Sequence, residues 1–130
     1  MVIEKDESFL LAERYVRETG LSLFLTGKAG TGKTTFLRHI VESCDKRCAV
    51  VAPTGVAAIN AGGVTIHSFF QLPLCPYLPD VKELVTEYQL PQHKTHLRRE
   101  RIDILRSLDL LIIDEVSMVR ADLMDAMDMM

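Results

Sequence analysis

The 130-residue sequence lacks a basic surplus, a rich set of cysteines and any long apolar run. Its formal net charge is −3, whereas proteins that coat duplex nucleic acid are usually basic, so any contact with nucleic acid must be local. Three cysteines, Cys44, Cys48 and Cys75, cannot all pair within one chain and lack zinc-site spacing, which favours free thiols in a reducing compartment. Without a secretory signal or an apolar run of membrane-spanning length, we expect a cytoplasmic protein with no membrane contact.

The composition is that of one ordinary globular core, with 48% hydrophobic and 25% charged residues. Hydrophobic periodicity predicts helices over residues 6–19, 33–44, 55–61, 98–107 and 120–130, and strands over 21–26, 48–52 and 108–113. Between them, the proline-rich stretch 72–94 is predicted to be an irregular insertion with one helix near 81–88. Strands that alternate with helices indicate an α/β fold: a parallel sheet covered by helices on both faces. The last strand, 108–113, does not alternate, which predicts burial on both of its faces.

The final predicted helix carries apolar residues on one face, namely Leu123, Ala126, Met127 and Met130. It ends without a glycine, a proline or a basic last turn, and Asp128 lies where the helix dipole disfavours a negative charge. We interpret Met130 as a cut inside an element, so residues 1–130 are expected to form a partial, C-terminally truncated domain.

A glycine-rich segment after the first predicted strand fits the pattern G-x-x-x-x-G-K-[ST] at every fixed position. The backbone amides of such a loop and of the following helix cradle phosphates, Lys33 reaches the terminal phosphates and the Thr34 hydroxyl ligates Mg²⁺. The predicted nucleotide-binding residues are Gly27, Lys28, Ala29, Gly30, Thr31, Gly32, Lys33, Thr34 and Thr35. The alternative, a glycine-rich loop with an incidental lysine, is disfavoured by the flanking strand and amphipathic helix. The segment therefore predicts binding of ATP with Mg²⁺.

A second motif follows the most apolar predicted strand, where Asp114 and Glu115 lie together. Ligands of open α/β sheets bind at the carboxyl ends of the strands. Asp114 is predicted to hold the magnesium ion with Thr34, and Glu115 to orient and deprotonate the attacking water. The catalytic residues are thus predicted to be Lys33, Asp114 and Glu115. An isolated acidic pair would more often be a solvated turn, and Asp109, at the start of the strand, is the weaker rival.

Two further segments lie between these motifs: Ala52-Pro53-Thr54-Gly55-Val56-Ala57-Ala58 and Thr65-Ile66-His67-Ser68-Phe69. After the acidic pair comes Val116-Ser117-Met118-Val119. With the glycine-rich loop, these motifs resemble the petite-integration-frequency (PIF) family of DNA helicases, which are RecD-like superfamily-one 5′-to-3′ motors. The resemblance spans roughly residues 21–126 and implies a RecA-like P-loop NTPase fold.

The resemblance also implies contacts with single-stranded DNA. It assigns Pro53, Thr54 and Gly55 to the DNA backbone, and Thr65 and His67 to a second contact. Thr54 precedes a short predicted helix whose free amides suit a phosphate. The alternative for Thr54 is a simple helix N-cap, and one residue can do both. For His67 a packed core histidine is the alternative.

Three other questions stay open. Phe69 and Phe70 could stack on bases, although core packing is the favoured interpretation. The basic run over residues 93–101 is interpreted as a solvated loop and helix face. Residues 1–20 contain no glutamine, and the family commonly uses one there to recognise adenine, so base selectivity is open.

The predicted function is ATP hydrolysis coupled to translocation on single-stranded DNA during replication, repair or recombination. In that reading the chain is the N-terminal part of a helicase's first motor domain, with single-stranded DNA as its partner. The alternatives are a P-loop ATPase that serves as a regulatory switch or in conjugative DNA processing, and an inert fragment that binds nucleotide weakly.

Overall fold

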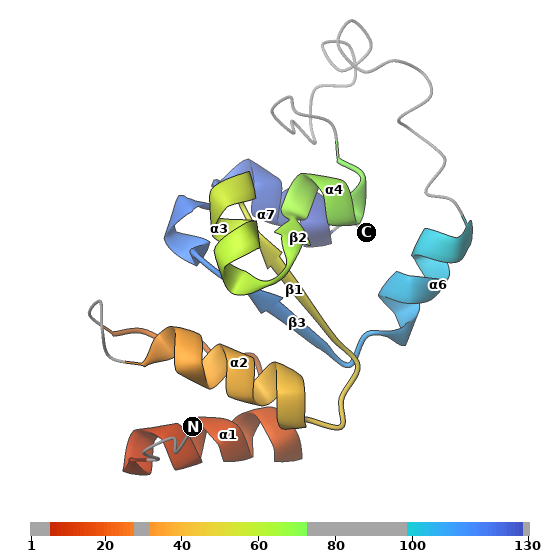
Figure 1. Ribbon diagram of the computed structural model, residues 1–130. Coiled ribbons are helices and arrows are strands. Elements are labelled where there is room, and N and C mark those ends of the chain that lie inside the picture. Colours follow the sequence, from red (N-terminus) through yellow and green to blue (C-terminus); the bar gives the residue numbers. More distant parts are fainter. Residues whose placement is uncertain (1–5, 28–31, 73–98, 129–130) are drawn as a thin grey trace, which may run out of the picture. The chain divides into compact units, whose positions relative to one another are not determined.

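The computed structural model describes residues 6–27, 32–72 and 99–128 (Figure 1). The chain divides into two compact units, Met1–Arg47 and Cys48–Met130. Within the described residues, no helix is both long enough and apolar enough to cross a membrane.

The first unit contains two helices. Helix α1 (Glu7–Glu18) begins after Asp6, whose side chain accepts a hydrogen bond of 2.8 Å from the amide of Phe9. This is an N-cap, which satisfies one of the amides that have no partner within the helix. Helix α2 (Lys33–Ser43) begins after Gly32, whose φ of 90° lies in the left-handed region that glycine adopts without penalty. Both helices confirm the ranges predicted from periodicity.

The predicted strand at residues 21–26 is wrong in the structure, because residues 21–27 form neither helix nor strand. A parallel strand is defined by hydrogen bonds to a neighbour, and the sheet of the described residues does not include this segment. Its apolar side chains are correspondingly open to solvent, with exposed fractions of 68% for Leu21, 43% for Leu23 and 73% for Phe24.

The second unit is built on a parallel sheet of three strands among the described residues, in the order β2 (Val64–Thr65), β1 (Cys48–Ala52), β3 (Leu110–Ile113). Helix α3 (Gly55–Ala61) connects β1 to β2, as predicted for residues 55–61. The other elements of this unit are α4 (Ile66–Phe70), α6 (Arg99–Ser107), the 3-10 helix η2 (Val116–Met118) and α7 (Ala121–Asp128). Strand β1 confirms the prediction for 48–52, and α6 and α7 confirm the last two predicted helices within the described residues.

The strands differ in burial. The consecutive residues Val51 and Ala52 of β1 are both fully buried, although their side chains point to opposite faces. In β3, by contrast, Leu111 is 36% exposed, so the predicted burial of this strand on both faces is wrong. The physical reason is position: in the described sheet β3 is an edge strand that pairs with β1 alone.

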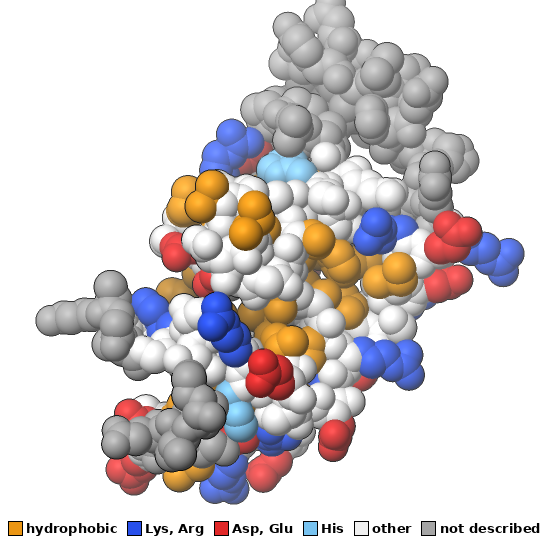
Figure 2. Space-filling model, in the orientation of Figure 1, with side chains coloured by type: hydrophobic (Ala, Val, Ile, Leu, Met, Phe, Trp, Pro, Cys, Tyr) orange, Lys and Arg blue, Asp and Glu red, His pale blue; other side chains and the backbone are white. Residues whose placement is uncertain are grey.

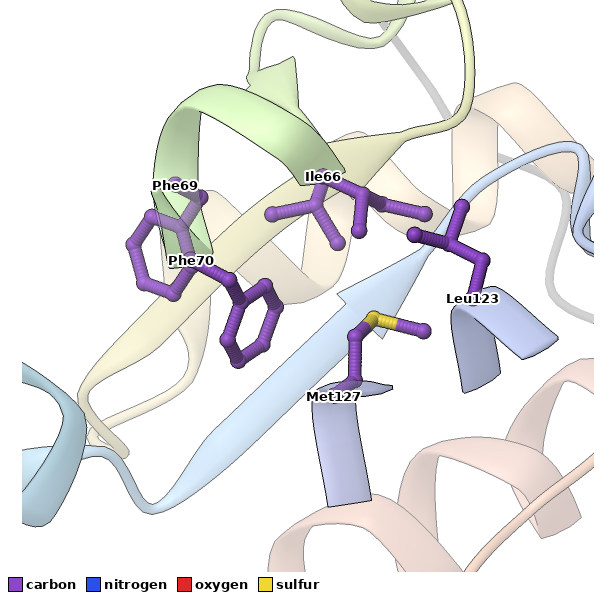
Figure 3. Packing of buried hydrophobic residues seen from close by; sticks show 6 residues of the cluster. Ile66, Phe69, Phe70, Leu123 and Met127 are labelled. Carbon is purple, nitrogen blue, oxygen red and sulfur yellow. The ribbon is translucent and has the colours of Figure 1, made fainter. Parts of the chain in front are cut away.

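The core of the second unit lies where α4 and α7 meet β1 (Figure 3). Its buried residues are Val51, Ile66, Phe69, Phe70, Leu123 and Met127. The rings of Phe69 and Phe70 meet edge to face with centroids 5.1 Å apart, and the guanidinium of Arg101 lies 5.7 Å from the Phe69 ring centroid. Both phenylalanines therefore pack in the core, as favoured from the sequence, and are not open to stack on bases.

Some expectations lie outside the described residues. They are the insertion beyond Leu72 with its helix at 81–88, the first part of the basic run, Cys75 and Met130. Of the described cysteines, Cys44 and Cys48 form no disulfide with each other.

Candidate nucleotide and nucleic-acid site

The glycine-rich loop opens helix α2. Gly27 and Gly32 are described, whereas the predicted nucleotide-binding residues Lys28, Ala29, Gly30 and Thr31 lie outside the described residues. The first backbone hydrogen bond of the helix runs 2.9 Å from the amide of Phe36 to the carbonyl of Gly32, so Lys33, Thr34 and Thr35 occupy the first turn, whose amides have no intrahelical acceptor. The Nζ of Lys33 donates to the carbonyl of Gly27. This bond joins the first residue of α2 to Gly27, the last described residue before the loop.

The acidic pair follows β3 directly. The amide of Asp114 donates to the carbonyl of Val51 over 2.9 Å, which extends the β1–β3 ladder by one bond. Glu115 then adopts φ 53° and ψ 44°, a left-handed conformation uncommon for a residue with a side chain. Its carbonyl accepts from the amide of Met118 at 3.0 Å, which closes η2. The chain thus turns sharply at the carboxyl end of the strand, and the backbone of both acidic residues is held there.

Two threonines lie at the same edge of the sheet. Thr54 caps α3: its hydroxyl oxygen accepts a hydrogen bond of 3.2 Å from the amide of Ala57. Thr65 caps α4 in the same way, since its hydroxyl oxygen accepts from the amide of Ser68 at 3.2 Å. Ala52 and Thr65 are partners in the β1–β2 register, so the two caps follow the carboxyl ends of neighbouring strands. Each hydroxyl that accepts from an amide keeps its own proton to donate. The expected N-cap role of Thr54 is confirmed.

The other predicted DNA contacts surround these caps. Pro53 lies in the turn between β1 and α3, and Gly55 is the first residue of α3. His67, in α4, is partly exposed and not a core residue, so its alternative as a packed core histidine is wrong. The outer face of α3 is apolar and uncharged: Figure 2 shows hydrophobic side chains over this helix, where Val56 and Ile59 are 72% and 80% exposed. Helix α3 therefore offers hydroxyl and amide donors to a phosphate, and no cations.

The structure brings only part of the predicted site together. Asp114, Glu115, Thr54 and Thr65 share the carboxyl edge of one sheet in the second unit. The glycine-rich loop, with Lys33 and Thr34, belongs to the first unit.

The expected magnesium ligands have the right chemistry. Among the described residues, no cluster of three or more His, Cys, Asp or Glu side chains could hold a metal ion by itself. Mg²⁺ is commonly bound by one or two protein oxygens, with the phosphates of the nucleotide and water completing its shell. One carboxylate from Asp114 and one hydroxyl from Thr34 are oxygen donors of that kind, so the donor set fits a nucleotide-borne Mg²⁺.

Sequence reasoning missed residues that hold the site in shape. A Cβ on Gly63 would lie 2.2 Å from the carbonyl oxygen of Val50, so a glycine is required for β2 to approach β1. In the sequence alone, the pair Gly62-Gly63 indicates no more than the end of the helix predicted over residues 55–61. On the first unit, Glu13 and Arg17 of α1 bond to α2. Their i, i+4 spacing was a visible signal for a pair within one helix, but gave no sign of a contact with another.

A parallel α/β sheet, a glycine-rich loop that opens a helix at Lys33 and an acidic pair after a strand define a P-loop nucleotide-binding protein. The family model of the PIF1-like helicase matches residues 4–130. The chain therefore belongs to the PIF1-like helicase family, which confirms the resemblance noted in its motifs.

Named relatives are similar over most of the chain. An ATP-dependent DNA helicase PIF1 of Emericella nidulans is 43% identical over 120 residues, which cover 87% of this chain and 15% of that protein. The PIF1 helicase of Saccharomyces cerevisiae is 37% identical over 116 residues, covering 85% of this chain and 12% of its own length.

Solved structures agree. Bacteroides Pif1 in complex with ADP-AlF4 is 41% identical with a TM-score of 0.83, covering 98% of this chain and 27% of that one. Bacteroides Pif1 bound to single-stranded DNA is also 41% identical, with a TM-score of 0.81. The match again covers 98% of this chain and 27% of that one. The RecA-like α/β fold class is thereby confirmed. The chain spans only 12–15% of the two fungal proteins and about a quarter of these solved chains.

Proposed function

We propose that this chain is the N-terminal part of the first motor domain of an ATP-dependent DNA helicase. In this proposal the complete protein hydrolyses ATP and uses the energy to translocate on single-stranded DNA. Family membership supports it, as do the structures of Bacteroides Pif1 in complex with ADP-AlF4 and bound to single-stranded DNA.

The observation that carries the proposal is the shared edge of the sheet. The hydrogen bond from Asp114 to Val51 fixes the acidic pair beside the end of β1, and Thr54 follows β1 two residues after Ala52. Residues suited to nucleotide chemistry and residues suited to a DNA backbone therefore lie on neighbouring strand ends. In this proposal, a change at one group reaches the other through few bonds, which is the coupling that a motor of this kind requires.

For hydrolysis, the proposal gives each residue one role. The first-turn amides of α2 bind phosphate oxygens, and the Lys33 ammonium neutralises charge on the terminal phosphates. Thr34 and Asp114 hold Mg²⁺, which supplies further charge neutralisation when bound. Glu115 orients the attacking water and accepts its proton.

For DNA, the proposed contacts are hydroxyl and amide donors. Thr54 and Thr65 donate their hydroxyl protons to backbone phosphates, with Pro53, Gly55 and His67 beside them. Contacts of this kind position a strand without reading its sequence. The proposal therefore expects little base preference from this part of the protein.

The test is Lys33→Ala in the full-length protein, with Arg38→Ala as a matched control. Arg38 is an exposed cation on the same helix, but it lies in the second turn. We expect DNA-stimulated ATP hydrolysis to fall by on the order of a hundredfold or more in Lys33→Ala, because the terminal phosphates lose their cation. The control should hydrolyse ATP normally. Normal turnover in Lys33→Ala, or a wild-type protein indifferent to every polynucleotide, would contradict the proposal.

A further inference from the structure

Helices α1 and α2 of the first unit form a parallel pair, visible side by side in Figure 1. Three contacts between them follow one another from the N-terminal to the C-terminal end of both helices. Near the start, the rings of Phe9 and Phe36 meet edge to face with centroids 5.0 Å apart. One turn on, Glu13 meets His39, and at the end Arg17 meets Ser43. Because the residue numbers rise together along both helices, the two helices run in the same direction.

The middle of the pair is held by one carboxylate that serves both helices. Oε1 of Glu13 accepts from Nε of Arg17 at 3.1 Å and lies 2.8 Å from Nε2 of His39. The side chains of Glu13 and His39 are only 14% and 15% exposed. Such partly buried, charge-assisted bonds are stronger than bonds on an open surface. The contact therefore fixes the rotation of α1 against α2.

The C-terminal ends of the two helices are capped crosswise. Arg17 of α1 donates to the carbonyl of Ser43, at the end of α2, over 2.9 Å, and to its hydroxyl over 2.6 Å. Lys46, which follows α2, donates over 2.7 Å to the carbonyl of Thr19, which follows α1. Parallel helices place both negative dipole ends together, and α2 has no basic residue in its own last turn. Helix α2 thus receives its neutralising cation, Arg17, from α1, and Lys46 adds a second cation at the end of α1, which already carries Arg17 in its own last turn.

We propose that Glu13 and Arg17 are positioning residues for nucleotide binding, because they anchor the P-loop helix at its far end. Helix α2 is a rod of about 16 Å for its 11 residues. Lys33 and the phosphate-binding amides lie at one end, and the Arg17 clamp lies at the other. A tilt about a loosened clamp displaces the phosphate-binding end, and displacements of about 1 Å cost roughly a hundredfold in a positioned site. The inference rests on the proposed function, since it names residues that shape the same nucleotide site.

The experiment compares Arg17→Met with Arg14→Met in the full-length protein. Arg14 is the matched control: it lies on the same helix and pairs at i, i+4 with Glu18, but that pair is exposed at 72% and 61%. Arg17→Lys keeps the charge but loses the planar guanidinium that reaches Ser43 and Glu13 together, and Glu13→Gln keeps an acceptor. The measurements are the Kd for ADP and ATP, the KM and kcat for ATP, and the melting temperature.

For Arg17→Met we expect the nucleotide Kd and the KM to rise roughly tenfold, and kcat at saturating ATP to fall by up to about a hundredfold, because Lys33 moves with the end of α2. Arg17→Lys should recover part of the loss, and Arg14→Met should bind as wild type does. A lower melting temperature with an unchanged Kd would show a merely structural role and overturn the inference. If Arg17→Met does not fold, Arg17→Lys and Glu13→Gln decide, and unchanged Kd values in both overturn it. A wild-type protein that binds no nucleotide would instead overturn the proposed function.

Discussion

At the scale of single residues, Glu115 combines an expected chemical role with an unfavourable backbone. Its left-handed conformation, at φ 53°, costs on the order of 1 kcal/mol or more for a residue with a side chain. The turn persists because the Asp114 amide is tied to Val51 on one side and η2 closes on the other. Strain of this kind collects at functional sites, where the surrounding structure holds it in place.

Glu115→Gln removes the proposed base and keeps the shape of the side chain. Nucleotide binding should survive, because Lys33, Thr34 and Asp114 are untouched, while turnover should fall by about a hundredfold or more. Nucleotide affinity and single-turnover hydrolysis measure the two effects separately. The control is Asp109→Asn, an exposed acidic residue before the same strand. Loss of turnover in Asp109→Asn with normal turnover in Glu115→Gln would reverse the assignment.

Gly63→Ala tests the close approach of β2 to β1. The new methyl group would meet the Val50 carbonyl oxygen at 2.2 Å, a backbone atom that cannot turn aside. We expect a loss of about 1–3 kcal/mol in the free energy of unfolding. Gly20→Ala is the matched control, since a Cβ there meets nothing within 4 Å. Equal melting temperatures for the two variants would show that β2 shifts without cost.

At the scale of elements, α3 and α4 are short helices that each begin with a threonine cap at the same edge of the sheet. One hydroxyl per helix therefore has two proposed tasks: it accepts from an amide of its own helix and donates to DNA. The two tasks can be separated by substitution.

Thr54→Ala combined with His67→Ala should weaken the stimulation of ATPase by single-stranded DNA while basal hydrolysis changes less. Thr54→Ala alone should also cost about 1 kcal/mol of stability, because α3 loses its cap. Thr54→Ser retains the hydroxyl and is the control for both effects. ATPase titrations with oligonucleotides and thermal unfolding give the two readouts. Full DNA stimulation in the double variant would remove these residues from the DNA contact.

Sequence reasoning succeeded where local pattern decides the structure. Helices α1, α2 and α3 follow from apolar spacing and from stops such as Gly62, and β1 from a short apolar run before Pro53. It failed at residues 21–26, because a strand depends on a neighbour that lies elsewhere in the chain. The left-handed Glu115 and the Arg17–Ser43 clamp were also invisible. Both depend on tertiary contacts that a composition pattern does not encode.

At the scale of the whole molecule, apolar surface and strand edges lie open. Leu21, Phe24 and Leu111 are 68%, 73% and 36% exposed, and β3 has one neighbour in the described sheet. An open strand edge can pair with another copy of the chain, and exposed apolar side chains favour association, while a typical domain has a total stability of only about 5–15 kcal/mol. We expect the isolated 130-residue polypeptide to be marginally stable and prone to aggregate.

Phe24→Ser and Phe36→Ser form a matched pair for this expectation. Phe24 is 73% exposed and Phe36 is 5% exposed. In the 130-residue polypeptide, Phe24→Ser should reduce aggregation and leave the melting temperature unchanged. Phe36→Ser should cost about 3–5 kcal/mol, because a buried ring is lost. Light scattering and thermal unfolding measure the two outcomes. A wild-type polypeptide that stays monomeric and unfolds cooperatively at high temperature would contradict the expectation.

The β1–β3 register also sets an order of events during synthesis. Strands β1 and β2 are separated in the sequence by one short helix. The pairing of Cys48 in β1 with Leu110 in β3 can form only after Leu110 has been synthesised. At about 5–20 residues per second, a ribosome needs roughly 3–12 s to make the intervening residues. The β1–α3–β2–α4 segment can close early, because its contacts are local. The edge of β1 that later pairs with β3 then has no partner strand for several seconds. Pulse-labelling hydrogen exchange on nascent chains should therefore detect protection of the Val64 amide before protection of the Ile112 amide.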